Sequence, residues 1–82
     1  MRRMDWITET TLRIAAATGL DAGPLLVDTT QAETLLDLAG FAAHDSGERT
    51  NAPLLCFVLG RAIAQGADLD VLERAVRGDA PA

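Results

Sequence analysis

The chain of 82 residues contains one cysteine, no tyrosine and no lysine. A single cysteine excludes an internal disulfide bond and a zinc site built from several thiolates. Aromatic residues make up only 4% of the chain, as Trp6, Phe41 and Phe57. Much of the hydrophobic content of 49% is alanine, which contributes little buried area per residue. We therefore expect a thin core that gains support from self-association or from a larger partner.

Positive charge is scarce as well. Lys and Arg total 7 against 12 Asp and Glu, so the formal net charge is −5 at pH 7. Binding to nucleic acid normally requires clustered Arg or Lys that neutralise phosphates, and an anionic membrane surface attracts basic segments in the same way. An acidic chain without a basic run therefore argues against both partners.

Long apolar runs are also missing. No apolar signal core follows the opening MRRMDW, and no segment approaches the roughly 20 apolar residues that a membrane helix needs. We expect a cytoplasmic protein that forms a single small helical domain over residues 1–82, with residues 1–3 and 79–82 frayed.

What the sequence does contain is helical periodicity interrupted by Gly and Pro. The pattern predicts helices near residues 4–18, 29–46, 52–65 and 68–77. Four helices joined by short turns indicate an all-α, compact four-helix bundle. Leu25-Leu26-Val27 lies in the first connector and should tuck under the helices as an anchor, since one short strand there would have no partner strand.

The helix ends carry recognisable signals. We expect Asp5 to cap the first helix and Gly19 to end it in a left-handed conformation. Two capping boxes compete at the start of the second helix, one from Asp28 with Gln31 and one from Thr30 with Glu33. Trp6 could stack on a ligand, but we expect it to cover one end of the core. We expect Asp68 to cap the fourth helix.

The third helix is apolar almost all round. Leu54, Leu55, Cys56, Phe57, Val58 and Leu59 follow one another without a polar residue. Such a helix must be buried on most sides, either centrally within the domain or against another subunit. We interpret Cys56 as a small buried hydrophobe, and Gly60 as a position that permits close packing.

A polar line runs along the second helix, through Glu33, Asp37, Gly40 and His44. Asp37 and His44 share one face about 10 Å apart, with Gly40 between them. A glycine in a helix interior costs roughly 1 kcal/mol relative to alanine, so something should approach closely there. Either another helix crosses tightly at Gly40, which we favour, or Gly40 forms a notch between an acid and an imidazole.

The turn after this helix holds the remaining polar candidates. His44 could be a hydrogen-bonded structural residue or a catalyst. Arg49 could bind an anionic ligand or a partner carboxylate, or could close the turn on Asp45 or on helix-end carbonyls. Asn51 or Thr50 should cap the third helix. Since no phosphate loop, GxSxG, HExxH or CxxC pattern is present, we assign no catalytic residue and no metal ligand. The binding candidates for a partner or a ligand are Asp37, His44, Arg49 and Asn51.

The same region carries a family resemblance. Its short motifs are Leu36-Asp37-Leu38-Ala39, Ala43-His44, Arg49, Ala52-Pro53-Leu54 and Phe57 to Gly60. In these motifs the chain resembles a small, uncharacterised helical domain of high-GC bacteria that occurs alone or fused behind molybdenum cofactor guanylyltransferases. The resemblance covers roughly Asp5 to Arg61. It departs at Thr10 and Thr11, where the family commonly has a longer apolar stretch.

The resemblance implies a link to the molybdenum cofactor, although it does not imply a reaction. A standalone copy would be a non-catalytic accessory piece (a small subunit, chaperone or adaptor) for cofactor synthesis or a molybdoenzyme. It would need a protein partner, and any association with the cofactor would go through that partner. His44 and Arg49 would then touch the partner or a phosphate-bearing cofactor.

Two other functions remain open. The chain could be a small ligand-binding protein or enzyme that uses Asp37, His44 and Arg49. It could also be a self-associating helical protein with the third helix at a two-fold contact.

Overall fold

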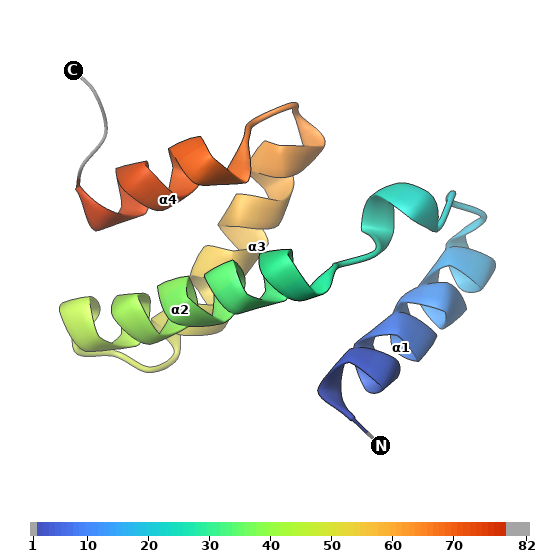
Figure 1. Cartoon of the computed structure of the whole chain (residues 1–82), viewed down its shortest axis with the longest axis horizontal. Coiled ribbons are helices and arrows are strands. Elements are labelled where there is room, and N and C mark those ends of the chain that lie inside the picture. The colour runs from blue at the N-terminus through green and yellow to red at the C-terminus, as the bar shows by residue number, and fades with distance from the viewer. Residues whose placement is uncertain (1, 79–82) are drawn as a thin grey trace. The chain divides into compact units, whose positions relative to one another are not determined.

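The chain is built from helices, and the computed structural model describes residues 2–78. The elements are α1 (Arg3–Thr18), a short 3-10 helix η1 (Gly23–Leu25), α2 (Thr29–Ser46), α3 (Asn51–Ala64) and α4 (Leu69–Arg77) (Figure 1). No strand occurs within residues 2–78. The predicted all-α fold of four helices is confirmed, with every boundary within one residue. Met1 and residues 79–82, which we expected to fray, lie outside the described residues.

The start of α1 differs from the prediction. The N-cap is Arg2 rather than Asp5, and it caps without a side-chain hydrogen bond. The Trp6 N–H donates to the Arg2 carbonyl at 3.0 Å, so the first intrahelical bond forms earlier in the chain than expected. Asp5 therefore lies in the first turn, where its carboxylate still favours the positive end of the helix dipole.

Other helix ends follow the predicted local chemistry. Gly19 has φ 73° and donates its N–H to the Ala15 carbonyl, so it ends α1 as expected. At the start of α2, Asp28 and Gln31 cap each other reciprocally, with bonds of 3.0 and 2.7 Å from the two backbone N–H groups. This resolves the competition between the two capping boxes. Asp68 caps α4 by accepting from the Asp70 N–H.

The chain divides into two compact units, Met1–Ala32 and Glu33–Ala82. In α1 of the first unit the buried residues are Thr11 and Ala15. The prediction that Trp6 covers the core was wrong, because Trp6 is 53% exposed. At about 100° per residue it lies roughly 140° around the helix from Thr11. Thr11 is tolerated in a buried position because its hydroxyl donates to the Ile7 carbonyl at 2.7 Å.

The second unit comprises α3, α4 and most of α2. Its buried large side chains are Leu38 of α2, which is 0% exposed, and Leu59 of α3, which is 2% exposed. Leu69, Leu72 and Val76 of α4 are half-buried, so this short helix contributes one apolar side to the same unit.

The second unit by itself does not bury α3 on most sides, which was one of the two alternatives that the sequence left open. Leu54, Phe57 and Val58 are 62%, 60% and 57% exposed. Leu59 of the same helix is 2% exposed, so α3 buries one side within this unit.

The two helix-interior glycines also differ from expectation. We predicted a tight helix crossing at Gly40 and close packing at Gly60. A Cβ atom built on either glycine meets nothing within 4 Å, and both residues are exposed. The favoured helix crossing at Gly40 is therefore not seen, and the close packing that Gly60 permits is not used within the described residues.

Candidate functional site

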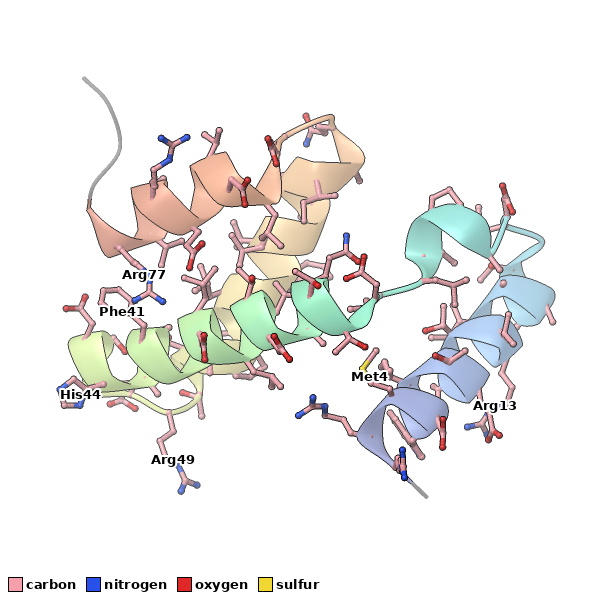
Figure 2. The ribbon with its side chains drawn as sticks, in the orientation of Figure 1. Met4, Arg13, Phe41, His44, Arg49 and Arg77 are labelled. Atoms are coloured by element: carbon pink, nitrogen blue, oxygen red, sulfur yellow. The ribbon has the colours of Figure 1, made fainter. Side chains whose placement is uncertain are left out.

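The polar candidates from the sequence do not assemble into one site. Asp37, His44 and Arg49 are all exposed. Among residues 2–78, none of their side chains forms a hydrogen bond or an ion pair. Figure 2 shows His44 at the end of α2 and Arg49 extending from the turn that follows. Their arrangement offers exposed contact groups and no enclosed site for proton transfer.

Ser46, rather than Arg49, closes the turn between α2 and α3. Its hydroxyl donates to the Ala42 carbonyl at 2.6 Å and accepts from the Glu48 N–H at 3.2 Å. The Asn51 N–H donates to the Glu48 carbonyl at 3.0 Å. The structural roles considered for His44 and Arg49 are therefore not seen in the described chain, where both residues are exposed.

A shallow groove of ≈ 330 Å³ lies within the second unit. Apolar side chains from three helices form most of its wall: Phe41, Ala42, Leu54, Leu55, Val58 and Val76. Asp45, Ser46 and Asn51 form its polar end. Among the sequence candidates, Asn51 reaches this groove, whereas Asp37, His44 and Arg49 are not part of its lining. The volume lies at the low end for a small-molecule site, but such sites usually enclose most of their ligand.

The polar end of the groove has unused hydrogen-bonding capacity. Asp45 is exposed and Asn51 is half-buried. In the described chain neither side chain has a hydrogen-bond partner, and Asp45 has no ion-pair partner. Asn51 does not cap α3 through its side chain, since the helix begins at this residue and its N-cap is Thr50. The carboxylate of Asp45 and the carboxamide of Asn51 thus lie in the same groove without partners among the described residues.

The groove continues onto the outward side of α3, which we call the α3 face and define as Leu54, Phe57, Val58 and Arg61. Leu54 and Val58 belong to both surfaces. Arg61 is the one charged residue of α3 and lies over the Phe57 ring, with its guanidinium carbon 4.3 Å from the ring centroid. Arg77 of α4 lies over Phe41 of the groove wall, with its guanidinium carbon 5.3 Å from the ring centroid (Figure 2). Arg77 also pairs with Glu73 at 3.5 Å.

The sequence candidates did not include the α3 face. Its signal was present in the uninterrupted apolar run, which exceeds what one buried side of a helix requires. Periodicity alone could not show which side of the run would remain uncovered.

Three other kinds of site were considered: a metal site, a reactive cysteine and a membrane-spanning helix. Within residues 2–78, no three His, Cys, Asp or Glu side chains gather where a metal ion could bind. Cys56 is half-buried. The helices of the described chain are too short or too polar to cross a membrane.

Comparison with known proteins gives one match. A family described as "Domain of unknown function (DUF6457)" matches residues 4–81. No curated protein matches the chain, and no solved structure matches it either.

Proposed function

The chain belongs to the DUF6457 family, whose description names no function, and from its surface we propose that it is a non-catalytic interaction module that acts by protein–protein contact. The observation that carries this proposal is the α3 face. Leu54, Phe57 and Val58 are each at least 57% exposed on one side of one helix. A contiguous apolar patch on a small protein marks an interaction surface more often than scattered apolar residues do.

The composition of α3 supports the same proposal. The centre of a protein–protein interface is depleted in charge and enriched in aromatic residues and arginine. The α3 face offers Phe57 and Arg61 among aliphatic side chains, with no acidic residue on the helix. An aromatic ring and a stacked guanidinium in contact are also typical components of binding hot spots.

The alternative of an enzyme or ligand-binding protein has weaker support. Asp37 and His44 lie on one side of α2, about 10 Å apart, and Arg49 lies in the turn beyond. A general acid or base must lie within hydrogen-bond reach of its target in a defined site. These three exposed side chains do not line the groove of the second unit, so no described cavity orients a substrate against them.

The partner system that we propose is the molybdenum cofactor pathway. This part rests on the resemblance of the motifs between Leu36 and Gly60 to the small domain found alone or behind molybdenum cofactor guanylyltransferases. In this proposal the chain is a small subunit, chaperone or adaptor for a molybdoenzyme or a cofactor-synthesis protein. His44 and Arg49 are exposed and unpaired within residues 2–78, which suits contact with that partner or with a phosphate on its cofactor.

Co-purification from native cells tests the proposal. A tagged chain at native abundance should recover a molybdoenzyme or a protein of cofactor synthesis. The double variant His44→Ala/Arg49→Ala should lower the recovery at least fivefold, whereas Arg74→Ala, which removes another exposed arginine from α4, should leave it unchanged. A chain that is recovered alone would overturn the interaction module. Recovery of partners unrelated to molybdenum would overturn the proposed pathway.

A further inference from the structure

We draw no further inference here: the strongest candidate, the shallow groove of the second unit with its polar end at Asp45 and Asn51, runs into the α3 face that already carries the proposed partner contact, and nothing in the structure shows what covers it.

Discussion

The outward sides of α2 and α3 differ sharply, although each helix buries a leucine on its inward side. The outward side of α2 carries the polar line of Glu33, Asp37, Gly40 and His44, and that of α3 carries Leu54, Phe57, Val58 and Arg61. The inward leucines, Leu38 and Leu59, are almost equally buried. Both helices therefore contribute a buried leucine to the core in the same way. They differ in the residues on the sides that face away from the core.

This difference shows where a function can be sought in a chain without a catalytic motif. The outward side of α2 exposes one large apolar side chain, Leu36, and is otherwise polar. The outward side of α3 leaves a large apolar area in water. Burial of such area is favourable by about 25 cal/mol per Å². A helix that is apolar on two sides gains stability only when the second side is also covered.

Leucine truncation on the two helices is the change with the largest expected effect. Leu38→Ala should lower the free energy of unfolding by about 2–5 kcal/mol, because it removes a fully buried side chain and leaves a cavity. Leu54→Ala should cost far less in the isolated chain, because Leu54 is already 62% exposed. Urea denaturation followed by circular dichroism measures both.

The size of the difference between the two variants tests the comparison of the two helices. Equal losses for Leu38→Ala and Leu54→Ala would contradict the assignment of α3 as the helix with an uncovered side.

Alanine at the two helix-interior glycines should have a smaller effect. Gly40→Ala should raise the free energy of unfolding by about 0.5–1 kcal/mol, because alanine is the better helix former and the added methyl group meets nothing. Gly60→Ala should raise it for the same reason, and urea denaturation measures both variants. A lower free energy of unfolding for Gly40→Ala would show that another part of the protein approaches α2 at this residue.

Truncation of the exposed polar side chains should have the smallest effect on stability. His44→Ala and Arg49→Ala should each change the free energy of unfolding by less than about 0.5 kcal/mol, since neither side chain has a partner within residues 2–78. Thermal denaturation checks this. A clear loss of stability would assign a structural role to that residue and would remove it from the proposed partner contact.

The helix boundaries could be predicted because their signals are local. The Asp28–Gln31 box and Gly19 act within four residues of themselves, through backbone geometry that needs no distant neighbour. The prediction that Asp5 caps α1 was wrong by three residues, since the N-cap is Arg2. A competing start at Arg3 uses ordinary backbone hydrogen bonds, which leave no mark in the residue types.

The buried sides of the helices could not be predicted as well. Trp6 and Leu54 are apolar, yet both are exposed, whereas Thr11 is buried with its hydroxyl bonded to its own helix. Helices with apolar residues on several sides do not determine which side packs, and the neighbouring elements decide it. The position of the α3 face depended on which side of α3 packs against its neighbours. The polar candidates could be listed from the sequence, but the α3 face required knowledge of what lies beside α3.

The complete burial of Leu38 has a consequence for the internal motions of the chain. Few large side chains of the described residues share this degree of burial, so few amides are protected by the global unfolding step alone. The slowest hydrogen exchange should be confined to the turns of α2 and α3 around Leu38 and Leu59, while the short helix α4 opens and closes on its own. A partner bound to the α3 face should then slow exchange along α3 itself, and exchange rates with and without that partner would map the contact amide by amide.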